Sequence, residues 1–244
     1  MRCLSALFVA LIATAVVPVA ILEAISEALA ADTYYVSPAE IDLVHILAPP
    51  PTPDSPEGKA DLEAVLAAVN SRTDASIKHA QDDDQRNVFR FADVMGPNFN
   101  AETLPLTAQL FQHVYEDGNA ATNAAKGYFQ RKRPFVVDPD IKIIVVQAPD
   151  FSYPSNHSTF GNESGILLAA MVPEKAVAIF ARAADYAHNR VIAGVHFPSD
   201  VEGGRIAASV IDNTLLHNPR FDSDFAKAKS EVRAALGLTA AGSQ

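Results

Sequence analysis

Residues 189–200 read Asn-Arg-Val-Ile-Ala-Gly-Val-His-Phe-Pro-Ser-Asp and join the end of one predicted helix to the start of the next. Ser199 is followed three residues later by Glu202, which predicts a capping box and a helix that starts at Asp200. Asp200 then lies within reach of the His196 ring. A carboxylate on one ring nitrogen leaves the other free as a nucleophile or base, and the alternative is a structural His–Asp pair.

Residues 153–159 read Tyr-Pro-Ser-Asn-His-Ser-Thr and lead into a predicted helix near 157–171. Ser155 or Asn156 is a suitable N-cap for that helix. Free backbone N–H groups and the positive end of the helix dipole would then face whatever lies beside His157. The pattern favours an anion site, and a capped helix with an incidental histidine is the alternative.

Residues 126–134 read Lys-Gly-Tyr-Phe-Gln-Arg-Lys-Arg-Pro. Lys126 and Arg133 lie seven residues apart, which places both on one face of a helix predicted near 105–133 and ended by Pro134. Two cations at a helix C-terminus can bind an anion. They can also form a solvated basic face that complements the helix dipole.

Taken together, the three segments contain each part that phosphate-ester hydrolysis requires. The reaction needs fixed positive donors around three oxygens, a nucleophile in line and an acid on the leaving oxygen. Lys126, Arg133 and Arg190 can supply the charge, and the two histidines can divide the roles of nucleophile and acid.

The ordered pattern Lys-x6-Arg-Pro, Pro-Ser-x-His and Arg-x5-His-x3-Asp resembles the three-part signature of the phosphatidic acid phosphatase type 2 superfamily. That superfamily includes bacterial class A non-specific acid phosphatases, membrane lipid phosphatases and vanadium-dependent haloperoxidases. The class A enzymes are the most similar in export signal, chain length, proline-rich N-terminal segment and the Arg-Pro-Phe at 133–135. The resemblance implies a compact all-α helical bundle without cofactor or metal.

The resemblance also implies a role for each matching residue. His196 would attack phosphorus, Asp200 would orient it, and His157 would protonate the leaving alkoxide before activating water. The phosphoryl oxygens would be held by Lys126, Arg133, Ser155, Asn156 and Arg190. The chain departs from the family pattern at Asn156, where glycine is usual, and at Asn189, where serine is usual.

We therefore expect an acid phosphatase that hydrolyses small phosphate monoesters through a phosphohistidine. A vanadate-dependent haloperoxidase and a non-catalytic phosphate-binding protein are the alternatives. A membrane lipid phosphatase is disfavoured because no apolar stretch after Leu22 approaches spanning length.

The remaining sequence is largely helical in its apolar spacing. Leu62, Val65, Leu66 and Val69 repeat at the interval of one buried helix face. Similar spacing predicts helices near 74–94, 174–190, 200–216 and 221–236, while residues 141–146 are interpreted as an extended connection. The expected domains are a signal peptide at 1–30, an extended Pro-rich segment at 31–56 and a helical phosphatase domain at 57–244.

The ends and the composition of the chain indicate where it works. An apolar stretch followed by Ala-Leu-Ala-Ala at 28–31 is typical of a cleaved secretory signal, so we expect a periplasmic or secreted protein, with an uncleaved anchor as the alternative. The only cysteine is Cys3, which lies within this signal. A formal charge of −10 disfavours nucleic-acid partners. No stable membrane insertion is expected after cleavage, and both a monomer and a homodimer remain open.

Two further segments have a structural interpretation. The prolines of residues 47–53 exclude a helix and predict a stiff strap, which is either a linker or a lip across the site. The acidic run at 82–84 lacks the alternating spacing of a calcium loop and is interpreted as a solvated helix face.

Overall fold

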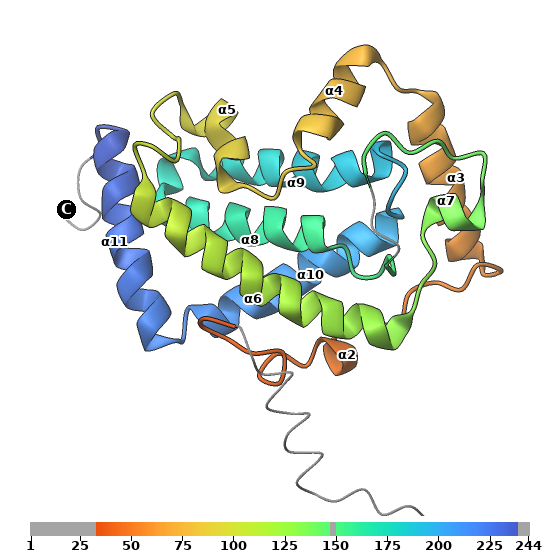
Figure 1. Cartoon of the computed structure of the whole chain (residues 1–244), viewed down its shortest axis with the longest axis horizontal. Helices are drawn as coiled ribbons and strands as arrows, with labels where there is room; N and C mark the ends of the chain where they lie inside the picture. Colours follow the sequence, from red (N-terminus) through yellow and green to blue (C-terminus); the bar gives the residue numbers. More distant parts are fainter. Residues whose placement is uncertain (1–32, 147–149, 239–244) are drawn as a thin grey trace, which may run out of the picture. The chain divides into compact units, whose positions relative to one another are not determined.

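The structure is a computed structural model that describes residues 33–146 and 150–238. Within these residues all regular secondary structure is helical, which confirms the predicted all-α class (Figure 1). The predicted signal peptide at 1–30 lies outside the described residues. The elements are α2 (Leu43–Ile46), α3 (Pro56–Asn70), α4 (Asp74–Asp82), η1 (Val88–Phe91), α5 (Ala92–Met95), α6 (Pro105–Phe129), α7 (Pro134–Val137), α8 (Asn156–Met171), η2 (Pro173–Lys175), α9 (Ala176–Ile192), α10 (Pro198–Leu215) and α11 (Pro219–Ala235).

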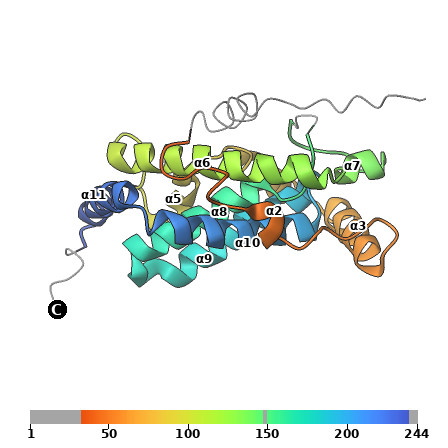
Figure 2. The ribbon, with the colours of Figure 1, turned by 90° about the horizontal axis from the view of Figure 1, so that it is seen from below.

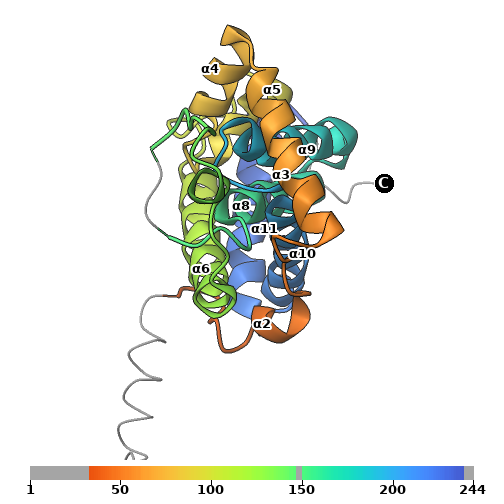
Figure 3. The ribbon, with the colours of Figure 1, turned by 90° about the vertical axis from the view of Figure 1, so that its right-hand side faces the viewer.

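Helix α8 lies at the centre of the bundle. It packs most extensively against α9 and α10 and also contacts α6, so α8 is ringed by other helices when seen end-on (Figure 3). Most of its residues are buried, as expected for a helix enclosed on every side. Small residues permit this packing: a Cβ on Gly165 would lie 2.8 Å from the Cβ of Ala183 on α9.

The motif-bearing ends of four helices meet at one end of the bundle. Figure 2 shows α6 along one side and α9 along the other, with α8 and α10 between them. The C-terminal ends of α6 and α9 come together with the N-terminal ends of α8 and α10. Backbone hydrogen bonds join them: Ser155 N–H donates to the Asp200 carbonyl at 3.0 Å, and Ser152 N–H donates to the Arg131 carbonyl at 2.9 Å.

The helix predicted over 105–133 ends earlier than expected. Helix α6 stops at Phe129 because Gln130 adopts a left-handed conformation, with φ of 50°. Arg133 instead occupies the N-cap position of the short helix α7, without a side-chain capping hydrogen bond, and Pro134 lies in the first turn of that helix. Lys126 and Arg133 therefore do not share a helix face, and the turn of the chain brings them together.

Two other boundaries also differ from the prediction. The helix predicted over 74–94 breaks after Asp82, because the next carboxylate, that of Asp83, points into the interior, where it binds Arg182. Helix α10 starts at Pro198 rather than Asp200. Its cap is the Asp200 carboxylate, which accepts from Phe197 N–H at 2.8 Å, so the Ser199–Glu202 capping box is wrong.

The Pro-rich segment lies against the motif-bearing end of the bundle, beside Arg131, Lys132 and Phe197. Residues 49–53 are not helical, as predicted, and line an apolar cavity of about 660 Å³ beside Tyr128 and Phe129 at the end of α6. Residues 141–146 form an extended connection without a strand, also as predicted. No helix in the described ranges is both long enough and apolar enough to cross a membrane.

Candidate active site

A polar cavity of about 440 Å³ opens at the motif-bearing end of the bundle. Six of the eight predicted site residues line it: Lys126, Arg133, Asn156, His157, Arg190 and His196. The other two, Ser155 and Asp200, are fully buried behind the cavity wall. The cavity thus collects side chains from α6, the approach to α7, α8, α9 and the turn before α10.

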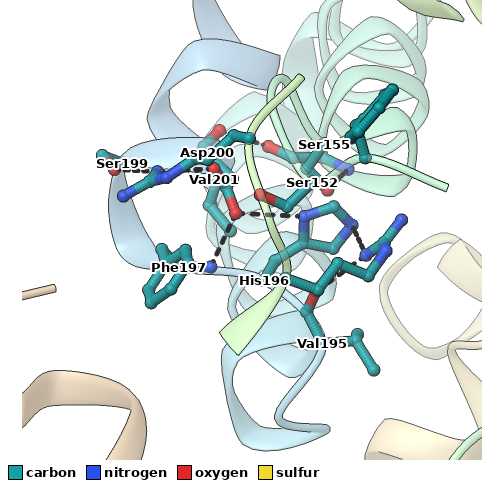
Figure 4. Close-up of polar contacts among 12 residues, drawn as sticks. Ser152, Ser155, Val195, His196, Phe197, Ser199, Asp200 and Val201 are labelled. Atoms are coloured by element: carbon teal, nitrogen blue, oxygen red, sulfur yellow. Dashed lines mark hydrogen bonds and ion pairs between the residues drawn. The ribbon is translucent and has the colours of Figure 1, made fainter. Parts of the chain in front are cut away.

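The His196 ring presents an unprotonated nitrogen toward the guanidinium of Arg133. Arg133 Nη1 can only donate, so the His196 Nε2 that lies 3.1 Å away accepts and must carry a lone pair. The proton of the neutral ring is then on Nδ1, 3.4 Å from Asp200 Oδ2 (Figure 4). Burial, together with the charges of Arg133 and Lys126, holds the pKa of His196 well below its usual range. The ring is therefore held neutral in the tautomer that a nucleophile requires.

Asp200 is anchored from two directions. Oδ2 accepts from Phe197 N–H at 2.8 Å, and Oδ1 accepts from Arg131 Nη1 at 2.6 Å (Figure 4). Arg131 also donates from Nη2 to Asp61 Oδ2 at 2.8 Å. Burial raises the pKa of Asp200, whereas the charge of Arg131 acts in the opposite direction. Because Asp200 has no exposed surface, this arginine is its main counterion.

His157 faces the cavity from the first turn of α8. Its Nε2 lies 2.9 Å from the main-chain oxygen of Asp84, which can only accept, so this nitrogen carries a proton. The Asp84 carboxylate is 3.7 Å from the same nitrogen. Burial and the charges of Arg190 and Arg86 hold the pKa of His157 well below its usual value. An anion bound between these cations would offset their charge and favour protonation of His157.

Two of the predicted phosphate-binding cations share one carboxylate. Arg133 donates from Nη2 to Asp150 Oδ1 at 2.7 Å, and Lys126 Nζ lies 3.8 Å from Asp150 Oδ2. Lys126 also donates to the carbonyl of Phe151. Burial and the neighbouring Arg133 lower the pKa of Lys126 to about 7. This lysine therefore carries its full charge only in acidic solution.

Arg190 has hydrogen-bond donors without a partner among the described residues. Its Nη1 donates to Asp84 Oδ1 at 2.7 Å, whereas Nε and Nη2 are buried and find no partner among the described residues. A buried guanidinium with unsatisfied donors is costly unless something supplies acceptors. The cavity that it lines has room for a phosphoryl group, whose oxygens are suitable acceptors.

The start of α8 confirms the predicted cap and explains Asn156. Ser155 Oγ accepts from Ser158 N–H at 3.3 Å, and the helix begins at Asn156. The Asn156 amide donates to the side-chain oxygens of Asn119 at 2.5 Å and Asn123 at 2.9 Å on α6. The added side chain thus ties α8 to α6 at the cavity wall.

Asn189 binds a buried aspartate that the sequence interpretation placed in solvent. Asn189 Nδ2 donates to Asp83 Oδ2 at 2.8 Å, and Arg182 Nη2 donates to Asp83 Oδ1 at 2.6 Å. Asp83 is fully buried and Asp84 lines the cavity, so the solvated-face interpretation of residues 82–84 is wrong for both. Asp83 and its partners hold the turn that positions Asp84.

Sequence reasoning missed the residues that surround this set. Asp84, Arg86 and Asp150 line the cavity, and Asp61 and Arg131 support Asp200. Arg131 lies within the Lys-x6-Arg-Pro motif, and Asp150 lies three residues before Tyr153, so the position of each in the sequence was a signal. Asp61 and Asp84 are brought to the site by partners far away in the chain.

Comparisons with known proteins agree on one family. Residues 114–221 match the family model described as the PAP2 superfamily. The non-specific acid phosphatase of Salmonella typhi is 31% identical over 197 residues, which cover 76% of this chain and 78% of that protein. The non-specific acid phosphatase of Providencia stuartii is 34% identical over 146 residues, or 58% of this chain and 59% of that one.

A solved structure shares the fold. The bacterial vanadium-dependent iodoperoxidase matches with a TM-score of 0.57 at 17% identity, over 75% of this chain and 53% of that chain. At this identity the likeness concerns architecture alone. The family model and the Salmonella relative, which this chain matches over most of its length, show that the protein belongs to the PAP2 superfamily and is a phosphatase related to the non-specific acid phosphatases.

Proposed function

We propose that this protein is an exported, metal-independent acid phosphatase that hydrolyses small phosphate monoesters through a phosphohistidine on His196. The observation that carries the proposal is the neutral His196 ring, whose Nε2 lone pair lies in a cavity lined by Lys126, Arg133 and Arg190. These three cations supply the charge stabilisation that a metal ion provides in other phosphatases. Phosphate monoesters are the substrates suggested by the names of the relatives.

The first step transfers the phosphoryl group to His196. Nε2 forms a bond to phosphorus as the bond to the ester oxygen breaks, and the leaving alkoxide takes a proton from His157. The Nδ1 proton remains directed at Asp200, which stabilises the positive ring that forms. Arg190 donates from its two unpartnered nitrogens, Nε and Nη2, to the phosphoryl oxygens.

The second step regenerates the enzyme. Neutral His157 takes a proton from water, the resulting hydroxide oxygen attacks phosphorus, and the bond to Nε2 breaks. The electron pair of the broken P–N bond returns to Nε2, inorganic phosphate leaves, and His157 is protonated again. Because one histidine must be neutral and the other protonated, the rate should follow a bell-shaped pH profile.

The test is release of p-nitrophenol from p-nitrophenyl phosphate in excess EDTA. We expect turnover by the wild type, no turnover by His196→Ala, and normal turnover by His188→Ala, an exposed histidine on α9 that serves as a matched control. Acid quenching during turnover should trap a phosphorylated protein. Activity lost to EDTA and restored by a divalent cation would contradict the metal-independent mechanism.

If neither the wild type nor the variants release p-nitrophenol, the proposed phosphatase activity is refuted. Addition of vanadate, peroxide and bromide would then distinguish a haloperoxidase, which halogenates, from a binding protein, which only titrates with phosphate.

A further inference from the structure

Arg86 is a fourth cation in the active-site cavity. It lies beyond the turn that follows α4 and lines the cavity together with His157 and Lys126. Its guanidinium carbon lies 5.0 Å above the centre of the Tyr115 ring on α6. This contact holds the end of an otherwise exposed side chain against the cavity wall.

Arg86 differs from the other three cations because its charge is not compensated. Arg190 is paired with Asp84 at 2.7 Å, and Arg133 and Lys126 are paired with Asp150 at 2.7 and 3.8 Å. Arg86 has no ion pair or hydrogen bond among residues 33–146 and 150–238. The rim of the cavity thus presents a guanidinium whose donors are available to a ligand.

The position of Arg86 places it on the side of the leaving group. It follows Asp84 by two residues, and the Asp84 main-chain oxygen binds His157. The charge of Arg86 contributes to the lowered pKa of His157, whereas the charges that act on His196 come from Arg133, Lys126, Arg190 and Arg131. Since His157 protonates the leaving oxygen, the alcohol part of the ester must extend past His157 toward Arg86.

We infer that Arg86 binds a second anionic group on the alcohol part of the substrate. The preferred substrates are then phosphate monoesters that carry a carboxylate or another phosphate a few bonds from the ester oxygen. The planar guanidinium can donate two parallel hydrogen bonds to such a group, while Tyr115 restricts its orientation. This inference rests on the proposed function for the position of the leaving group.

The first test compares two substrates that differ at one carbon. Glycerol 3-phosphate ends in a hydroxymethyl group, and 3-phosphoglycerate ends in a carboxylate. We expect Arg86→Gln to raise KM for 3-phosphoglycerate about tenfold, which corresponds to one charge-assisted hydrogen-bonded contact. KM for glycerol 3-phosphate should change less than about twofold, and any change in kcat that follows from loss of the Arg86 charge beside His157 should be the same for both substrates.

The matched control is Arg205→Gln. Arg205 is an exposed arginine on α10 that pairs with Glu202 at 2.7 Å and does not line the cavity. It should leave both KM values unchanged, so a general effect of lost surface charge is excluded. Equal changes in KM for the two substrates with Arg86→Gln would overturn the inference.

A binding measurement separates this inference from the proposed function. Calorimetry with 3-phosphonopropionate and with propylphosphonate requires no turnover, because neither phosphonate can be hydrolysed. We expect Arg86→Gln to weaken 3-phosphonopropionate about tenfold and propylphosphonate less than about twofold. If neither glycerol 3-phosphate nor 3-phosphoglycerate is hydrolysed, the proposed function fails while this difference still supports the subsite. If Arg86→Gln binds both phosphonates like the wild type, the subsite is refuted.

Discussion

At the scale of single residues, His196, the proposed nucleophile, is the first of four side chains that contact one another in sequence. His196 contacts Asp200, Asp200 binds Arg131, and Arg131 binds Asp61. Asp61 and Asp200 come from different helices, α3 and α10, and Arg131 lies between them. A carboxylate with no exposed surface stays ionised only if a cation faces it. We therefore regard Arg131 as a positioning residue that acts through Asp200.

Replacement of Arg131 by methionine should change the pH profile as well as the rate. Without the cation, the buried Asp200 retains its proton to higher pH, so the acid limb of kcat/KM should shift upward by about one pH unit. The profile with p-nitrophenyl phosphate measures this shift. Lys132→Met is the matched control, because Lys132 is exposed and does not line the catalytic cavity, and Arg131→Lys should restore part of the original profile. A uniform loss of rate with an unshifted acid limb would indicate a purely structural arginine.

The spacing of the motifs predicted five of the ionisable residues that line the cavity, but it did not predict Asp84, Arg86 or Asp150, or the partners of any of them. The motif residues lie near helix ends that meet, so their spacing within each motif was enough to predict that they lie together. Asp84 reaches Arg190 over a separation of 106 residues, and Asp61 reaches Arg131 over 70. Contacts of this length depend on tertiary packing, which one sequence does not display.

At the scale of elements, the site depends on how closely α8 approaches α10. A Cβ on Gly204 of α10 would lie 2.6 Å from the carbonyl oxygen of Ser155 and 2.7 Å from Ser158 Cβ. The first of these atoms belongs to the backbone at the start of α8, so it cannot move aside without shifting the helix N-terminus. His157 is in the first turn of that helix.

Gly204→Ala should therefore lower both stability and activity. We expect a loss of about 1–3 kcal/mol in the free energy of unfolding, as for overpacked cores, measured by urea denaturation. The turnover rate with p-nitrophenyl phosphate should fall as well, because His157 shifts with the helix. Gly127→Ala on α6 is the matched control: it has nothing within 4 Å and should gain about 0.5–1 kcal/mol. A stable and fully active Gly204→Ala variant would show that the two helices can separate without cost.

The sequence predicted the existence of the long helices better than their ends. Both ends of helices α8, α9, α10 and α11 were predicted to within two residues, because long apolar periods dominate there. The predicted helix ends were wrong where a side chain makes a contact that the local sequence does not indicate. Asp83 leaves the helical path to bind Arg182, and Asp200 caps α10 in place of Ser199. The hydrogen-bond partners of these two carboxylates depend on the tertiary structure.

At the scale of the whole molecule, the bundle encloses a pair of carboxyl groups that the chemistry does not use. Glu163 on α8 and Asp212 on α10 are buried, and none of their four carboxyl oxygens has a partner among the described residues. Gly118 on α6 leaves room for the first: a Cβ there would lie 2.7 Å from both Glu163 oxygens. Burial raises the pKa of both groups well above the usual range, and Glu163 also raises that of Asp212.

This pair should make the folded state more stable in acid than at neutral pH. Below the ordinary carboxyl pKa, both the folded and unfolded chains hold these protons, so the free energy of unfolding does not depend on pH through this pair. As pH rises above it, the unfolded chain releases protons that the folded chain retains, so unfolding becomes more favourable until the raised pKa is passed. Asp117 on α6 faces Glu163 and adds to the effect. His157 and His196, with lowered pKa values, act in the opposite direction.

The double variant Glu163→Gln/Asp212→Asn leaves those groups in place, so its difference in stability from the wild type isolates the effect of the Glu163–Asp212 pair. We expect the Tm of the variant minus that of the wild type to increase from pH 4.5 to pH 7.5. The increase should be about 4 °C or less for each kcal/mol by which the carboxyl pair destabilises the wild type over this range. Thermal unfolding followed by circular dichroism across this range measures the gain. A Tm difference that is the same at both pH values would mean that the two carboxyls titrate alike in the folded and unfolded chains.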